Sequence, residues 1–192
     1  QLGISTNTLS KSTEKLSSGY RINRAADDAA GLSISEKMRS QIRGLNKASS
    51  NAQDGISAIQ TAEGALNEAH SILQRMNELA TQSANDTNTT ADRTAVQSEV
   101  NALTNELSRI ASTSQFNTQN LLDGTFTGKN LQVGALENQK ITISIGTMNA
   151  TALGVNSLDV KSFAKAGSAM TLIQKAISKV SGQRSDLGAL QN

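Results

Sequence analysis

The sequence predicts a mainly α-helical fold, an elongated rod of three long heptad-patterned helices with a small β-hairpin region. The 192 residues contain no proline, although average usage would give about ten, and proline would break the hydrogen bonds of a helix interior. Aromatic residues make up only 2% of the chain, so a narrow core of aliphatic side chains is expected. Apolar residues recur every three or four positions over long stretches, which is typical of helices that pack along their length.

Residues 1–28 predict an N-terminal arm or connector. Leu2, Leu9 and Leu16 recur every seven residues, which suits a marginal helix, and Ser17-Ser18-Gly19 indicates a break. We therefore expect an arm over residues 1–28 and a rod domain over residues 29–192.

The first long helix is expected over about residues 29–84. Asp27 and Asp28 offer an N-cap and negative charge at its start, where free N–H groups and the helix dipole favour both. At about 1.5 Å per residue it would be about 85 Å long, which a compact domain of this size does not normally contain. Its heptad seam alternates spacings of four and three, and only two members are not apolar: Ile34, Met38, Gln41, Leu45, Ala48, Ala52, Gly55, Ile59, Ala62, Leu66, Ala69, Leu73, Met76 and Ala80.

Two further helices complete the predicted rod. One is expected over about residues 90–112 with Thr89 or Thr90 as its N-cap, and the polar loop before it is short enough to make it antiparallel to the first helix. The other is expected over about residues 168–192. Between them, a β-hairpin region is expected over about residues 124–146, because Asp123-Gly124 indicates a turn and Ile141–Ile145 alternates apolar and polar residues.

The sequence argues against catalytic and metal chemistry. It has no cysteine, which excludes disulfides, thiol nucleophiles and cysteine-based zinc sites. His70 is the only histidine, and no glycine-rich phosphate loop is present. No apolar run is long enough to cross a membrane, and a net charge of +2 with scattered basic residues does not indicate nucleic-acid binding. We expect no enzymatic activity, cofactor or metal.

Several motifs resemble bacterial flagellins, and together they cover essentially the whole chain. The run Glu14–Asn23 followed by Asp27–Leu32 is similar to the N-terminal signature of that family. The other matching segments are Asn51–Ser57, Thr61–Leu66, Leu73–Ala80, Gln115–Asn117, Leu121–Gly124 and Gln183–Asn192.

This resemblance implies a structural subunit of the flagellar filament, which polymerises with copies of itself through coiled-coil-like helix packing and serves motility. It also implies export by the flagellar machinery with a chaperone, without a cleaved signal peptide, and a location in the extracellular filament. Compared with the family, the terminal segments that form an inner coiled-coil tube are missing or reduced, so a core rod-domain fragment is expected. A hook–filament junction protein of the same superfamily remains the alternative.

The resemblance further implies that the rod domain is a ligand of Toll-like receptor 5 of animal hosts. Residue by residue, the family's receptor contacts fall on Arg75, Leu79 and Glu99, with Gln74, Glu78 and Gln82 as neighbours. Arg75 and Leu79 are four residues apart, a spacing that places two residues on one helix face. An arginine beside a leucine is a reasonable anchor pair for an interface.

Overall fold

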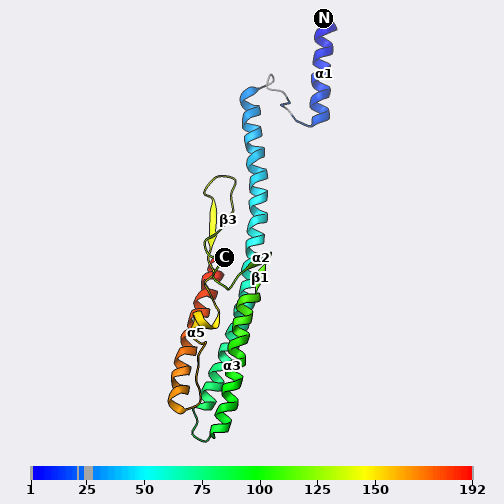
Figure 1. Cartoon of the computed structure of the whole chain (residues 1–192). Coiled ribbons are helices and arrows are strands. Elements are labelled where there is room, and N and C mark those ends of the chain that lie inside the picture. The colour runs from blue at the N-terminus through cyan, green and yellow to red at the C-terminus, as the bar shows by residue number, and fades with distance from the viewer. Residues whose placement is uncertain (1, 21, 24–27, 192) are drawn as a thin grey trace. The chain divides into compact units, whose positions relative to one another are not determined.

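The computed structural model describes residues 2–20, 22–23 and 28–191. Long helices make up most of it and strands occur only as two short pairs, which confirms the predicted mainly α class (Figure 1). The elements in chain order are α1 (Leu2–Ser18), α2 (Ala29–Ser83), α3 (Thr90–Thr113), β1 (Gln115–Phe116), β2 (Gln119–Asn120), β3 (Lys129–Gln132), β4 (Lys140–Ile143), α4 (Ala150–Leu153) and α5 (Phe163–Gln191).

The chain divides into two compact units. The first contains residues 1–50 and 132–139, and the second contains residues 51–131 and 140–192. The expected division into an arm over residues 1–28 and a rod domain over residues 29–192 stays a prediction.

In the first unit, the predicted arm contains a 17-residue helix, α1. Asp28 precedes α2, and its carboxylate accepts a hydrogen bond of 2.8 Å from the backbone N–H of Gly31, as expected of a cap. Its predicted companion, Asp27, lies outside the described residues. The guanidinium group of Arg39 lies 4.1 Å from the centroid of the Tyr20 ring, so a cation–π contact joins α2 to the segment before it.

The heptad seam of α2 is buried along only part of its length. Ile34, Met38 and Leu45 are 60%, 57% and 54% exposed. From Ile59 to Ala80 every seam residue is buried. The same sequence pattern therefore marks an open face in the first unit and a core face in the second.

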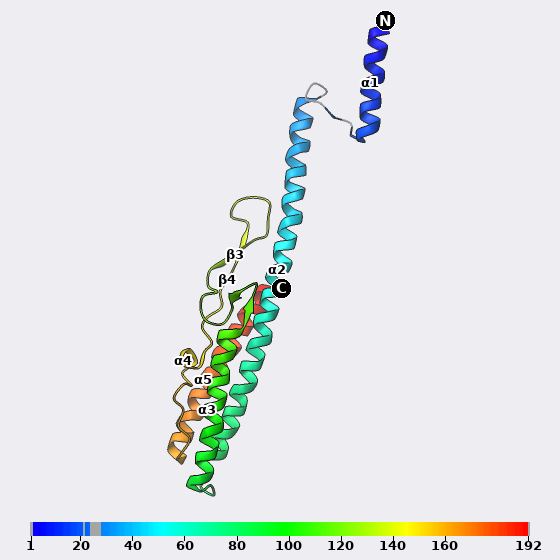
Figure 2. The ribbon, with the colours of Figure 1, turned by 45° about the vertical axis from the view of Figure 1, so that its right-hand side comes forward.

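The core of the second unit lies between α2, α3 and α5, which run side by side in two views (Figures 1 and 2). Full burial of a large aliphatic side chain contributes about 1.5–3 kcal/mol, so this cluster is the main source of stability in the unit. The hydroxyl of Thr81 lies 3.2 Å from the sulfur of Met170, which places the first turns of α5 beside the last turn of α2. The largest fully buried side chains of the three helices are Leu66, Leu73, Met76, Leu79, Val100, Leu107, Ile173 and Leu187.

Helix α5 begins at Phe163, five residues before its predicted start near residue 168. Its first turn is closed by a hydrogen bond of 2.9 Å from the N–H of Ala166 to the carbonyl of Ser162. Ala166 and Ala169 are buried and extend the seam toward the N-terminus. The predicted helix was too short because its apolar seam consisted of larger side chains and did not include these two alanines.

Two short hairpins follow α3, where one region over residues 124–146 was expected. The pair β1–β2 lies before that region, with Gln115 opposite Asn120 and Phe116 opposite Gln119. Asn117 and Thr118 connect these strands with positive φ angles of 46° and 62°, as a tight two-residue hairpin turn requires. The second pair, β3–β4, lies inside the expected region.

Gly55 has a packing role that explains its place in an otherwise apolar seam. A Cβ atom at this position would collide with the side chain of Leu131, which approaches the helix from β3. The glycine therefore allows the hairpin segment to lie close against α2.

Candidate functional site

The candidate site is the surface that α2 and α3 share, together with the turn between them. Thr89 is the N-cap of α3, one of the two residues predicted for that position, and it forms a capping box with Asp92. The Thr89 hydroxyl and backbone N–H donate to the Asp92 carboxylate at 2.7 and 2.8 Å. These hydrogen bonds lower the pKa of the Asp92 carboxyl, with the hydroxyl as the larger cause.

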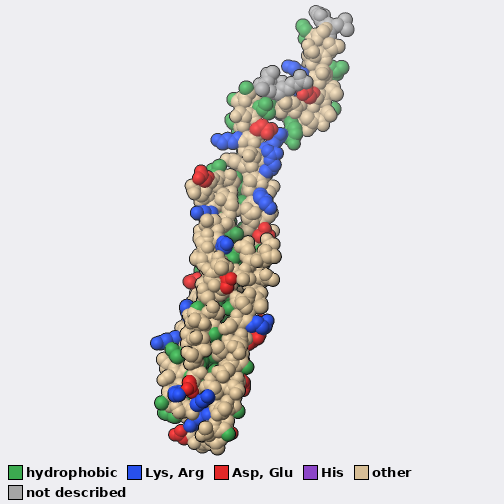
Figure 3. Space-filling view, in the orientation of Figure 1, with side chains coloured by type: hydrophobic (Ala, Val, Ile, Leu, Met, Phe, Trp, Pro, Cys, Tyr) green, Lys and Arg blue, Asp and Glu red, His purple; other side chains and the backbone are tan. Residues whose placement is uncertain are grey.

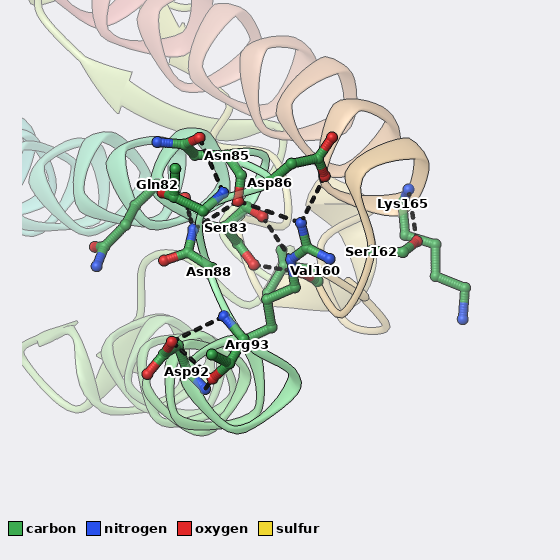
Figure 4. A network of polar contacts seen from close by, with 12 residues as sticks. Gln82, Ser83, Asn85, Asp86, Asn88, Asp92, Arg93, Val160, Ser162 and Lys165 are labelled. Carbon is green, nitrogen blue, oxygen red and sulfur yellow. Dashed lines mark hydrogen bonds and ion pairs between the residues drawn. The ribbon is translucent and has the colours of Figure 1, made fainter.

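Arg93 ties the α2–α3 turn together (Figure 4). Its Nε–H donates to the carbonyl of Ser83 at 3.1 Å, and its NH2 group donates to the carbonyl of Asn85 at 3.2 Å and to the carboxylate of Asp86 at 3.0 Å. The Arg93 side chain is only 16% exposed, so the turn is held by a largely buried cation that satisfies the last carbonyl of α2, at Ser83, and the carbonyl of Asn85 in the turn.

The loop before α5 is fixed to this turn by two buried polar side chains. The Gln97 amide donates to the carbonyl of Leu158 and accepts from the N–H of Val160, both at 2.8 Å. The Ser83 hydroxyl donates to the carbonyl of Val160. These bonds give the loop backbone the partners that it would otherwise find in water, which buried polar groups require. The sequence contains no signal for this role, because a glutamine that follows the apolar residue Val96 in a helix is expected on the surface.

Arg75 lies in a network with two carboxylates. Its Nε–H and NH2 groups donate to Oε1 of Glu99 at 3.0 and 2.9 Å, and its NH1 group donates to Glu78 at 3.1 Å. The hydrogen bonds to Glu99, and next those to Glu78, raise the pKa of Arg75. Three of the six residues carried over from the family therefore meet in one cluster across α2 and α3, hereafter the Arg75 cluster (Arg75, Glu78 and Glu99).

The other three carried-over residues lie outside this cluster. Gln74 is exposed, and its amide lies 3.1 Å from Nε2 of His70. Gln82 is exposed one turn further along α2, where its carbonyl accepts from the side chain of Asn88 at 2.6 Å.

Leu79, the last of the carried-over residues, is buried. Its side chain is 1% exposed and belongs to the core cluster. It therefore does not form an exposed anchor pair with Arg75. The two residues are four positions apart, but Leu79 belongs to the core cluster while Arg75 is half exposed and bonds Glu99 of α3.

The described residues include no cluster of three or more histidine, aspartate or glutamate side chains that could hold a metal ion. None of the described helices combines the length and hydropathy needed to span a membrane. The face drawn in Figure 3 carries Lys, Arg, Asp and Glu side chains scattered among other groups. The α2–α3 surface presents ion pairs on two packed helices. Such a surface suits recognition of another macromolecule.

Comparison with known proteins identifies the family. A family model described as the bacterial flagellin N-terminal helical region matches residues 1–127. Flagellin from Halalkalibacterium halodurans is 53% identical and covers 100% of this chain and 71% of its own length. The flagellar filament 33 kDa core protein of Treponema phagedenis is 49% identical and covers 100% of this chain and 72% of its own length. Flagellin from Clostridium tyrobutyricum is 59% identical over 79% of this chain, which spans only 42% of that relative.

Solved structures agree with this assignment. The crystal structure of Bacillus cereus flagellin matches with a TM-score of 0.63 and 30% identity, covering 73% of this chain and 82% of that one. FliC from Burkholderia pseudomallei has the same TM-score of 0.63 at 19% identity. The match covers 72% of this chain and 99% of that one, and it shows that the two share the fold. This chain belongs to the bacterial flagellin family, whose members are structural proteins and not enzymes.

Proposed function

We propose that this chain is a structural subunit of the bacterial flagellar filament, which polymerises with copies of itself and serves motility. The observation that carries the proposal is the likeness over the whole chain to flagellins and to a filament core protein. The exposed apolar residues of α2, such as Ile34, Met38 and Ile42, support it, because exposed apolar surface of this kind is typical of interaction sites. As a filament subunit, the protein is exported through the flagellar machinery with its chaperone and lies outside the cell.

The test is complementation of a motile bacterium deleted for its own flagellin. The whole flagellin that contains this sequence is expressed in the deletion strain, and we expect filaments in electron micrographs and restored swimming. A variant with Leu66→Asp, which places a charge in the core, is the negative control. Secretion of the intact protein without any filament would contradict the proposal.

The alternative, a hook–filament junction protein, differs in copy number and position. A filament subunit is found along the entire filament, whereas a junction protein is confined to its base. Antibody labelling against this chain therefore separates the two functions, and the relatives named flagellin favour the filament.

A second proposed function is recognition by Toll-like receptor 5 of animal hosts. The Arg75 cluster supports it, because the Arg75 and Glu99 side chains are 50% and 45% exposed and are held together by hydrogen bonds. A charged group that is ordered before binding loses less conformational entropy in an interface. Leu79 contributes to this proposal as a core residue that supports the helix beneath the cluster, while Gln74 and Gln82 flank it.

Binding to the immobilised receptor ectodomain tests this second function. We expect Arg75→Ala to weaken binding about tenfold or more, as for an interface hot spot. The matched control is Arg109→Ala, because Arg109 forms an equally exposed ion pair with Glu106 on α3. Leu79→Met keeps the core volume and should leave binding unchanged. Equal affinities of the Arg75 and Arg109 variants would remove the Arg75 cluster from the receptor interface.

A further inference from the structure

An apolar groove of about 230 Å³ lies in the second unit beside the hairpins. Phe116, Phe126, Leu131 and Ile143 line it, and Gly55 and Ala58 belong to its α2 wall. Pockets for small molecules typically measure about 300–1,000 Å³, so this groove suits a single apolar side chain better than a metabolite.

The groove also carries charge. Asp54 lies in its lining, is exposed, and forms no ion pair within the described part of the chain. Lys129 also belongs to the lining, with its ammonium group 5.7 Å from the centroid of the Phe126 ring, so the groove holds one charge of each sign. An occupant with an aromatic ring and a neighbouring cation would match both the apolar lining and Asp54.

The same unit presents such a group elsewhere. Phe163, the first residue of α5, is 62% exposed. Lys165 beside it is paired with Asp159 at 2.6 Å. Asp159 also accepts a hydrogen bond from the backbone N–H of Lys161 at 2.9 Å, and the pKa of its carboxyl is lowered by the hydrogen bond from Lys165 first and by the Lys161 charge in addition. The ammonium group of Lys161 has no ion pair of its own among the described residues. Phe163 and Lys161 therefore form an exposed apolar knob with an adjacent positive charge.

The knob and the groove lie at opposite ends of the second unit. The Ser83 hydroxyl bonds the carbonyl of Val160, so Phe163 lies close to the end of α2. From Ala58 in the groove to Ser83 the helix rises about 38 Å over 25 residues at ~1.5 Å per residue. Phe163 therefore does not reach the groove of its own chain, and a contact between the two requires a second copy.

We infer that Phe163 of one copy inserts into the groove of the next copy, with Lys161 paired to Asp54. The contact is heterologous, because knob and groove are different surfaces, and each copy offers both. Repetition of such a contact gives an open chain of subunits rather than a closed dimer. It deepens the proposed function by naming an axial contact, and it rests on that function.

This contact is one part of a larger interface. A buried aromatic side chain removes about 150–250 Å² from water, whereas a stable interface buries about 1,200–2,000 Å². The knob therefore contributes within the filament and is not expected to hold two free subunits together.

Cross-linking tests the contact directly, because the chain has no native cysteine. The whole flagellin carrying both Asp54→Cys and Lys161→Cys is assembled into filaments and treated with a short thiol-reactive bifunctional linker. We expect a ladder of covalent oligomers, and only monomers from unassembled protein, since the two sites of one copy are too far apart to be linked. The matched control pairs Lys161→Cys with Asn105→Cys, an exposed site on α3.

The outcomes separate the contact from the proposed function. Filaments that give no ladder, or as much ladder with the Asn105→Cys control, would overturn the contact and leave the filament function standing. If the unsubstituted protein forms no filament at all, the proposed function itself fails.

Charge reversal provides a second measurement that does not depend on cysteines. We expect Asp54→Lys or Lys161→Asp alone to raise the critical concentration for polymerisation at least threefold, and the two together to return it toward the original value. Phe163→Ala should raise it by a similar factor, whereas Phe163→Leu, which keeps an apolar knob, should have a smaller effect. An unchanged critical concentration in Phe163→Ala, or no recovery in the double reversal, would contradict the contact.

Discussion

Arg75 and Leu79 show that a match to a family motif does not predict whether a side chain is exposed or buried. Both match the family motif and both were expected on one helix face, yet Arg75 is half exposed in an ion-pair network and Leu79 is in the core. A helix face is about one hundred degrees wide, so two residues four positions apart can lie on either side of the boundary between core and surface. The position of that boundary depends on where α3 and α5 pack, which the motif does not encode.

Gln97 is the residue whose loss we expect to be most costly among the polar side chains. Gln97→Ala leaves the buried carbonyl of Leu158 and the N–H of Val160 without partners, and each unsatisfied group costs about 1–3 kcal/mol. Chemical denaturation should show this loss of unfolding free energy. Asn101→Ala is the control, because Asn101 is exposed and its side chain accepts a hydrogen bond from Gln97 without contacting the loop backbone groups that Gln97 satisfies. Equal stability of the two variants would show that water replaces the Gln97 amide.

The Asp92 capping box predicts a pH dependence. Hydrogen bonds from Thr89 lower the folded-state pKa of Asp92 below its unfolded value of about 3.9. The stabilisation is therefore fully present above that unfolded pKa and is lost as the pH falls through the lowered folded-state pKa. NMR titration should find the Asp92 carboxyl titrating below its usual range, and Thr89→Ala should move it back. An ordinary pKa in the unsubstituted protein would contradict the capping-box geometry.

At the scale of elements, α2 is one helix of 55 residues whose two halves have different surroundings. Ile34, Met38 and Leu45 are exposed, whereas Leu66 and Leu73 are fully buried. Local opening requires less free energy where a helix buries little apolar surface. In the unassembled protein we therefore expect backbone amides of residues 34–45 to exchange hydrogen at least tenfold faster than those of residues 59–80. Uniform protection along α2 would contradict this difference.

The elements predicted from sequence were those governed by local rules. Thr89 at the N-cap of α3 and the bounds of α2 followed from capping residues and heptad spacing. The start of α5 at Phe163 and the β1–β2 hairpin did not, because Ala166 contributes through close packing and Asn117-Thr118 is not one of the usual turn pairs. In the candidate site, the three residues of the Arg75 cluster were named from the family resemblance. The Gln97 contacts could not be predicted, because they depend on a loop 61 residues away in sequence.

For the whole molecule, the chemistry of the sequence and the structure point to the same kind of function. The buried core of the second unit is mostly aliphatic, and its residues come from α2, α3 and α5 and from the hairpins and loops between α3 and α5. What the molecule offers to its surroundings is apolar residues on α2, the knob and groove of the second unit, and paired charges on α2 and α3. Under the proposed function these features bind other chains, and repeated binding between identical chains builds a filament.

Electron cryomicroscopy of filaments assembled by the whole flagellin that contains this sequence is the measurement that tests this most directly. We expect each repeating subunit in the density to contain α2, α3 and α5 packed as described, with side-chain density that fits this sequence along the full length of the filament. Density that fits a different protein along the filament, with this chain found only at its base next to the hook, would contradict the filament-subunit function.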